Sequence, residues 1–368
     1  MRDAEAKEFL RRSGWGEAQI AKLPGDAATR NYARLTANGK SAILMDQPQN
    51  AEAPTAPEHA STAERQALGY NALARLAGAD TSRFVAMAEH LRGRGLAAPQ
   101  IYAADHAKGF LVLEDFGDRV FVDALDQGAA EDELYKAAAE VLALLHTAPA
   151  PSHLSPNMPL YAYDEAALLA ETDLLTEWFL PLALGREATA EEHAEHRALW
   201  RTVLNRISGH ELVLVHRDFH AQNLMWMPDR KGLARVGLID FQDAVAGSRG
   251  YDLISLTEDA RRDVSPELAE HTLASYLAAM RAQGTQIDEN TLRTEMAIMA
   301  AERNAKIVGI FARLYKRDKK PRYLALLPRV WGHLERDLAH PALAPLRAWY
   351  DRTIPGSKRL PRAEEDKQ

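Results

Sequence analysis

The sequence contains no cysteine among its 368 residues, so disulfide bonds and thiolate metal sites are excluded. No run approaches the roughly 18 consecutive apolar residues that a membrane-spanning helix needs. Residues 1–15 carry scattered charges and lack the apolar core of a signal peptide. An excess of basic residues is also missing, because the net charge is -7, and this argues against nucleic acid as a partner. We therefore expect a cytoplasmic protein with a small-molecule substrate and no nucleic-acid or membrane partner, and a monomer is the working expectation.

The composition that is present, 46% hydrophobic and 26% charged, is that of an ordinary globular protein. Its length suggests about two domains or lobes. Strand-like and helical segments alternate in the first part of the chain, whereas helical periodicity dominates from residue 131 onward. This order favours an α+β fold with a small sheet-containing lobe and a larger helical lobe. We expect the lobes at 1–116 and 117–354, with a tail at 355–368.

Local signals place several elements. Asn38-Gly39 lies between two strand-like runs, and this dipeptide is typical of a hairpin turn. Ser61 and Glu64 fit a capping box, which opens a helix that we expect Gly78 to end. Helical periodicity also marks 3–13, 83–92, 134–146, 160–184, 192–208, 251–261, 265–283, 289–317 and 322–339, and the strand-like runs are 32–36, 41–46, 101–103, 110–113, 212–215 and a hairpin over 224–239.

The segment that follows residue 210 carries three polar positions on an apolar frame. Asp218 comes directly after His216 and Arg217, Asn223 follows it, and Asp240 lies beyond the predicted hairpin. Phosphoryl transfer needs a carboxylate that accepts the proton of the attacking hydroxyl, and oxygen ligands that hold magnesium on the phosphates. We assign the first role to Asp218 and the second to Asn223 and Asp240. Each could alone be a turn residue, but all three in this order favour an ATP- and magnesium-dependent phosphotransferase.

This segment resembles the catalytic and metal-binding loops of the aminoglycoside phosphotransferase family, which also includes choline kinases. The run that begins at Tyr251 and the strand over 111–115 support the resemblance. It implies a two-lobed, protein-kinase-like fold. Asp240-Phe241-Gln242 stands where a protein kinase has D-F-G, and the missing Gly argues against a true protein kinase.

A narrower resemblance comes from the runs DFHAQNLMWMP, ARVGLIDFQDAV, YDLISLTEDARRDV and AERNAKIVGIFARL. They are similar to the anomeric amino-sugar kinases of Gram-negative cell-wall recycling. This resemblance implies ATP and Mg²⁺ as cofactors, and the 1-hydroxyl of N-acetylmuramate or N-acetylglucosamine as the acceptor. An antibiotic-modifying phosphotransferase remains an alternative, because the net charge of -7 is compatible with an acidic cleft for polycationic substrates.

The nucleotide site departs from the kinase pattern. Protein kinases grip the phosphates with a Lys on the third strand, whereas Met45 stands near that position here. A nucleotide-binding regulatory protein without turnover is therefore a second alternative. Arg30 and Arg34 could replace the missing cation, because Arg suits bidentate phosphate contacts, although each could also be a solvated side chain. Gly25 begins a loop placed to cover the phosphates, but the loop is not a Gly-rich motif.

The hinge between the lobes is expected at Glu114 to Phe116, where backbone groups would bond adenine. Two polar residues near the catalytic positions have open roles. His220 could contact the sugar or brace the catalytic loop. Asp243 could orient the metal ligand, support the substrate or cap a turn.

Further candidates for sugar contacts lie in the helical part. Glu171, Asp173, Glu177 and Trp178 share one predicted helix, and carboxylates with an indole suit sugar hydroxyls and a ring face. An exposed helix face with one core Trp is the plainer alternative. Arg303 could read an acetyl or lactyl group, or it could make a buried contact between helices.

Overall fold

The computed structural model describes residues 1–24, 30–48 and 52–361. The chain divides into two compact units. Unit 1 comprises Met1–Val141, Pro151–Tyr161 and Ala221–Ala244, and unit 2 comprises Leu142–Ala150, Ala162–His220 and Val245–Gln368. The lobe boundary near residue 116 remains a prediction. Within the described ranges, no helix has the length and apolar character needed to cross a membrane.

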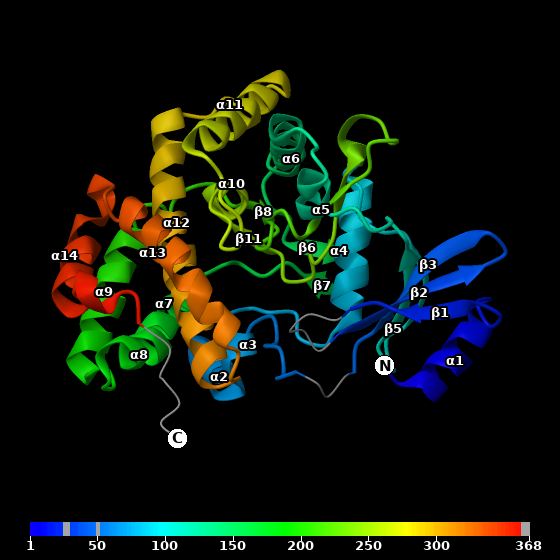
Figure 1. The fold of residues 1–368 in the computed structure, drawn as a ribbon, viewed down its shortest axis with the longest axis horizontal. Helices are drawn as coiled ribbons and strands as arrows, with labels where there is room; N and C mark the ends of the chain where they lie inside the picture. The colour runs from blue at the N-terminus through cyan, green and yellow to red at the C-terminus, as the bar shows by residue number, and fades with distance from the viewer. Residues whose placement is uncertain (25–29, 49–51, 362–368) are drawn as a thin grey trace. The chain divides into compact units, whose positions relative to one another are not determined.

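The centre of unit 1 is an antiparallel sheet with strand order β1-β2-β3-β5-β4 (Figure 1). Asn38 and Gly39 form the predicted hairpin turn between β2 and β3, with φ angles of 52° and 72°. Helix α1 packs Phe9 and Leu10 against the apolar side chains of this sheet, as the sequence predicts. These elements are α1 (Asp3–Arg12), β1 (Gln19–Lys22), β2 (Asn31–Ala37), β3 (Lys40–Asp46), β4 (Ile101–Asp105) and β5 (Phe110–Glu114).

The helix predicted at the capping box is shorter than expected. The box itself is confirmed, because the Ser61 N–H donates to the Glu64 carboxylate (2.8 Å) and the Glu64 N–H donates to the Ser61 hydroxyl (3.3 Å). The end predicted at Gly78 is wrong, because Gly69 has a φ of 102° and breaks the helix there. The other elements of unit 1 are α2 (Thr62–Leu68), α3 (Tyr70–Leu73), α4 (Thr81–Gly93), α5 (Phe121–Asp126), most of α6 (Glu131–Leu145), β6 (His153–Ser155), β7 (Met158–Pro159), β9 (Leu224–Trp226), a 3₁₀ turn (Gly232–Arg235) and β10 (Val236–Leu238).

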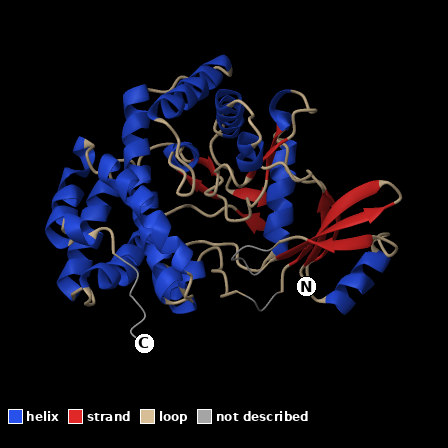
Figure 2. Cartoon of the chain, viewed as in Figure 1, coloured by secondary structure: helices blue, strands red, loops and turns tan. Residues whose placement is uncertain are grey.

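Unit 2 is mainly helical, and Figure 2 shows how few strands it contains. The long helix α12 runs through its hydrophobic core and contacts α7, α10 and α13. Trp200, Trp331 and Trp349 are buried in the same core. The elements are α7 (Glu165–Leu174), a π-helical turn (Leu175–Phe179), α8 (Leu180–Leu184), α9 (Ala190–Leu204), β8 (Val213–Val215), β11 (Val245–Gly247), α10 (Gly250–Thr257), α11 (Pro266–Ala282), α12 (Glu289–Lys316), α13 (Leu327–Asp337), α14 (Ala344–Thr353) and 3₁₀ turns at Pro321–Leu326, Pro341–Leu343 and Gly356–Lys358.

Two predicted helices of unit 2 are divided in the structure. The segment 160–184 becomes helical only after Asp164, whose side chain accepts the Ala167 N–H (2.9 Å), and it then passes through the π-helical turn. The segment 322–339 begins as a 3₁₀ turn, and Pro328 occupies the first turn of α13, where a missing N–H is harmless. The short strands β1 and β11 and the helix α14 are not predicted from the sequence.

Helices α12 and α7 meet at Gly309. A Cβ atom on this residue would lie 2.3 Å from the carbonyl carbon of Leu174 and 2.5 Å from the carbonyl oxygen. The two backbones can approach this closely only because Gly309 has no side chain. Gly332 in α13 differs, because the nearest atom to a Cβ there is an Arg336 nitrogen at 3.8 Å.

We expect Gly309→Ala to lower the free energy of unfolding by about 1–3 kcal/mol, because the added methyl group overpacks the contact with α7. Gly332→Ala is the matched control and should raise stability by roughly 0.5–1 kcal/mol, because Ala favours a helix interior. Urea denaturation of the two variants measures both effects. If the two variants had the same free energy of unfolding, α7 and α12 would be able to move apart without a loss of stability.

Candidate active site

The predicted base lies in a loop that Asp252 holds through the backbone. The loop follows β8, and Asp252 lies in the first turn of α10. Its buried carboxylate accepts hydrogen bonds from the backbone N–H groups of His216 (2.6 Å) and Arg217 (3.0 Å). Burial raises the pKa of Asp252 to about 7, and these two N–H groups oppose that shift. Asp218 is the next residue, so its position depends directly on this contact.

The charges around Asp218 favour its ionised form. Burial alone would raise the pKa of Asp218, but the charges of His220, Lys306 and Arg217 outweigh burial and hold the pKa below its ordinary value. An ionised carboxylate is the form that can accept a proton from an attacking hydroxyl. Burial lowers the pKa of His220, although the charge of Asp218 opposes this. The backbone N–H of His220 donates to the Asp218 carbonyl (3.0 Å), which braces the loop.

The two predicted metal ligands lie together in unit 1. Asn223 Nδ2 is 3.4 Å from Asp240 Oδ2, and the Ile239 N–H donates to the Asn223 carbonyl (3.3 Å). The side chain of Asp240 is 38% exposed, so a ligand can reach it. Asp240 supplies carboxylate oxygens and the Asn223 side chain also carries an amide oxygen, and Mg²⁺ takes one or two such protein oxygens and completes its shell with water and phosphate. No cluster of three or more His, Asp or Glu side chains suited to a metal occurs in the part of the chain that the structure describes.

Arg30 lies beside this pair. Its Nη2 atom is 3.0 Å from Asp240 Oδ1, and Gln242 Nε2 donates to the same oxygen (3.1 Å). Burial lowers the pKa of Arg30, but the charges of Tyr32 and Asp240 outweigh burial and raise it. Met45 is buried in β3 opposite Tyr32 and presents no cation. Of the two candidate cations, Arg30 is therefore the one that reaches the metal pair.

Arg34 has other partners. Its guanidinium pairs with Asp115 (2.7 Å) and Asp118 (2.6 Å). To contact a phosphate, Arg34 would first have to break its ion pairs with these two carboxylates. The alternative of a merely solvated side chain is also wrong, because both ion pairs hold it in place.

The expected hinge is fixed by side-chain contacts. The Glu114 N–H donates to the Gln100 carbonyl (2.8 Å), so it is not free for adenine. The Glu114 carboxylate pairs with Arg230 (2.7 Å), whose guanidinium carbon lies 5.0 Å from the centroid of the Phe116 ring. Adenine binding here would therefore use the remaining backbone groups. Gly25 lies outside the described residues.

The predicted substrate residues are in several environments. Asp243 accepts the Ala77 N–H (2.6 Å) and so braces a turn of unit 1. Arg303 is buried in α12 and donates to the Glu258 carbonyl (3.1 Å), which is the predicted structural alternative. Glu177 is exposed, and Trp178 is half-buried against the core of unit 2. Their contacts with a sugar stay a prediction.

Comparison with known proteins places this geometry in a family. Residues 19–285 match the phosphotransferase enzyme family. The chain belongs to this family. Membership confirms the expected phosphotransferase activity and the resemblance to aminoglycoside phosphotransferases.

Two curated relatives carry the same name. The N-acetylmuramate/N-acetylglucosamine kinase of Caulobacter vibrioides is 43% identical over 96% of this chain and 97% of its own length. The protein of that name from Pseudomonas aeruginosa is 31% identical over 94% of this chain and 92% of its own length.

Solved structures confirm the kinase-like fold. A microcompartment-associated aminopropanol kinase has a TM-score of 0.60 at 13% identity, over 93% of this chain and 99% of that chain. An ADP-bound aminoglycoside phosphotransferase has a TM-score of 0.55 at 16% identity, over 90% of this chain and 97% of that chain.

Several charged residues of unit 2 lie in surroundings that the sequence does not predict. Asp252 stands in a run that supports the family resemblance, but no role is predicted for it. Lys306 lies in α12, within the run AERNAKIVGIFARL that supports the narrower resemblance, but no role is predicted for it. Glu171 and Asp173 are buried and pair with Arg217 and Arg197, so an exposed helix face is wrong for these two carboxylates. Their burial follows from contacts between distant helices, which local periodicity does not show.

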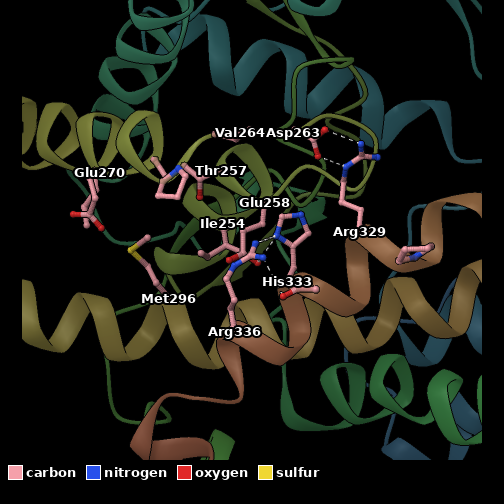
Figure 3. A pocket seen from close by; sticks show the side chains of 15 residues that line it. Ile254, Thr257, Glu258, Asp263, Val264, Glu270, Met296, Arg329, His333 and Arg336 are labelled. Atoms are coloured by element: carbon pink, nitrogen blue, oxygen red, sulfur yellow. Dashed lines mark hydrogen bonds and ion pairs between the residues drawn. The ribbon is translucent and has the colours of Figure 1, made fainter. Parts of the chain in front are cut away.

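A cavity of about 670 Å³ lies elsewhere in unit 2, among α10, α11, α12 and α13 (Figure 3). Glu258, His333 and Arg336 form its polar wall, and Asp263 faces Arg329 at its edge. None of the described residues that the sequence predicts for the site lines this cavity. Asp218, Asn223 and Asp240 therefore stay the residues predicted to carry out phosphoryl transfer.

We expect Asn223→Ala and Asp240→Ala to raise the magnesium concentration needed for half-maximal activity, or to abolish activity, because each removes one oxygen ligand. Titration of ADP release against Mg²⁺ measures the effect. Asp229→Ala is the control, because Asp229 is exposed in the turn of the same hairpin. An unchanged magnesium dependence in both site variants would place the metal elsewhere.

Proposed function

We propose that this phosphotransferase transfers the γ-phosphoryl group of ATP to the anomeric 1-hydroxyl of N-acetylmuramate or N-acetylglucosamine, as part of peptidoglycan recycling. The supporting observation is the 43% identity with a kinase named for these two sugars, over 96% of this chain. The likeness to aminoglycoside and aminopropanol kinases supports the fold alone.

Asp218 acts as the general base in this proposal. It accepts the proton of the sugar hydroxyl as that oxygen attacks the γ-phosphorus. The new oxygen–phosphorus bond forms while the bond to the bridging oxygen of ADP breaks, and ADP leaves. The lowered pKa of Asp218 supports the role, because the carboxylate is already ionised before the reaction.

Asn223 and Asp240 would hold Mg²⁺, whose charge would offset the negative charge of the phosphate groups. Arg30 would contact the phosphates in place of the missing third-strand Lys, because a guanidinium can exchange a carboxylate partner for a phosphate. The ion pair between Arg30 and the partly exposed Asp240 supports this role. Backbone groups near Phe116 would bind adenine.

We expect Asp218→Asn to lower kcat by roughly 10²–10⁴, because the amide cannot accept a proton in the transition state. The affinity for ATP should change little. A coupled assay of ADP release measures kcat, and Asp263→Asn, which removes an exposed carboxylate paired with Arg329, serves as the control. Near-normal turnover in Asp218→Asn would remove Asp218 from its proposed role.

The position of phosphorylation can be tested with a blocked sugar. A base assists only a hydroxyl within hydrogen-bond reach, about 2.6–3.2 Å. The free sugar has an anomeric hydroxyl, whereas its 1-O-methyl glycoside has none. We therefore expect the glycoside to compete with the sugar for binding and to yield no phosphorylated product, as measured by mass spectrometry.

Phosphorylation of the glycoside at another hydroxyl would disprove reaction at C1. Robust activity on kanamycin-like substrates, with none on amino sugars, would favour the antibiotic-modifying alternative. Absence of turnover on every acceptor would favour the regulatory alternative that Met45 suggests.

A further inference from the structure

Unit 2 contains a cluster of buried charged side chains that includes Arg217, the residue before Asp218. The guanidinium of Arg217 contacts one carboxylate oxygen of Glu171 in α7. Lys306 of α12 lies 3.1 Å from the other oxygen of Glu171, and its Nζ donates to the Tyr251 hydroxyl (2.6 Å). The side chains of Glu171, Arg217 and Lys306 are only 2%, 3% and 12% exposed. These three charges come from segments that are far apart in the sequence.

The cluster carries one positive charge in excess. Arg217 and Lys306 are two cations, and Glu171 can neutralise only one of them. Glu302 is also buried here, and burial together with the charge of Glu171 raises its pKa well above the ordinary value. Lys306 and Arg217 both lower the pKa of the nearby Asp218 carboxylate.

The same cluster also holds the backbone that aims Asp218. Arg217 has a φ of 75°, a left-handed conformation that residues with side chains rarely adopt. Its N–H is fixed by Asp252, and its guanidinium is fixed by Glu171 and lies 4.6 Å from the centroid of the Tyr163 ring. Asp218 follows immediately, so any release of the Arg217 side chain would redirect it.

We propose that Lys306 is a positioning residue for Asp218: with Glu171 it holds Arg217 in place, and its positive charge acts on the Asp218 carboxylate. The inference rests on the proposed role of Asp218 as the general base. Lys306 acts on Asp218 in two ways, through its contact with Glu171, which holds Arg217, and through the electric field of its charge. It needs no contact with either substrate.

The test compares kcat and the pH dependence of kcat/KM for wild type, Lys306→Met and Lys306→Arg. Loss of the positive charge raises the pKa of Asp218, so the acidic limb should move to higher pH, by about one unit. We expect kcat of Lys306→Met to fall about 10–100-fold, with the KM for ATP changed less than threefold. Lys306→Arg keeps the charge and should keep the wild-type limb.

Two controls isolate the effect. Arg293→Met removes a cation from the same helix at an exposed site, where it pairs with Glu270 and Glu289, and it should leave the profile unchanged. The other ionisable groups that face Asp218 are His216, Arg217, His220 and Asp252. If protonation of Asp252 causes the acidic limb of the kcat/KM profile, the limb should disappear in Asp252→Asn. If protonation of Asp218 causes it, the limb should remain in that variant.

The inference is overturned if Lys306→Met keeps the wild-type kcat and acidic limb, or if its activity falls only with its folded fraction by circular dichroism. Should that variant fail to fold, Tyr251→Phe removes the hydrogen bond to Lys306 and leaves the charge. It should lower kcat several-fold without moving the limb, and an unchanged kcat would contradict the proposal. Asp218→Asn separates the two hypotheses: if it is fully active, the proposed base is wrong, and if it is inactive while Lys306→Met behaves as wild type, only the inference fails.

Discussion

The two hydrogen bonds from the backbone to the buried carboxylate of Asp252 are the contact on which the catalytic loop depends. The strand β8 is only three residues long, so its ladder with β11 ends before the loop begins. The N–H groups of His216 and Arg217 would then be buried without partners, at a cost of about 1–3 kcal/mol each. Asp252 satisfies both groups at once. The loop can therefore leave the strand sharply and still hold Asp218 in a defined position.

The proposed nucleotide site lacks the cation that protein kinases carry on the third strand. A phosphate site needs positive charge, and the family pattern places it on β3, where this chain has Met45. The structure brings Arg30 to Asp240 instead, at the metal pair itself. The guanidinium of Arg30 offsets part of the negative charge of the Asp240 carboxylate. The departure at Met45 is thus compatible with an active phosphotransferase.

Much of this arrangement could be predicted because its signals are local. Asn38-Gly39 needs only its own two φ angles to form a turn, and the order of Asp218, Asn223 and Asp240 reflects the few roles that phosphoryl transfer requires. The roles of Glu171 and Lys306 beside Arg217 could not be predicted from local signals. Each is one charged residue in a long helical pattern, and its role arises only when α7 and α12 pack together against the loop. A charged side chain becomes buried through contacts between distant helices, so its burial produces no periodic pattern in the sequence.

The backbone conformations of Arg217 and Asp240 show what the site requires. Both residues have positive φ, 75° and 61°, which costs roughly 1–2 kcal/mol for a residue with a side chain. Glycine would remove that cost at either position. A glycine at 217 could not reach Glu171, however, and a glycine at 240 would supply no carboxylate partner for Arg30. The strain persists because the side chain at each position makes a contact that glycine cannot make.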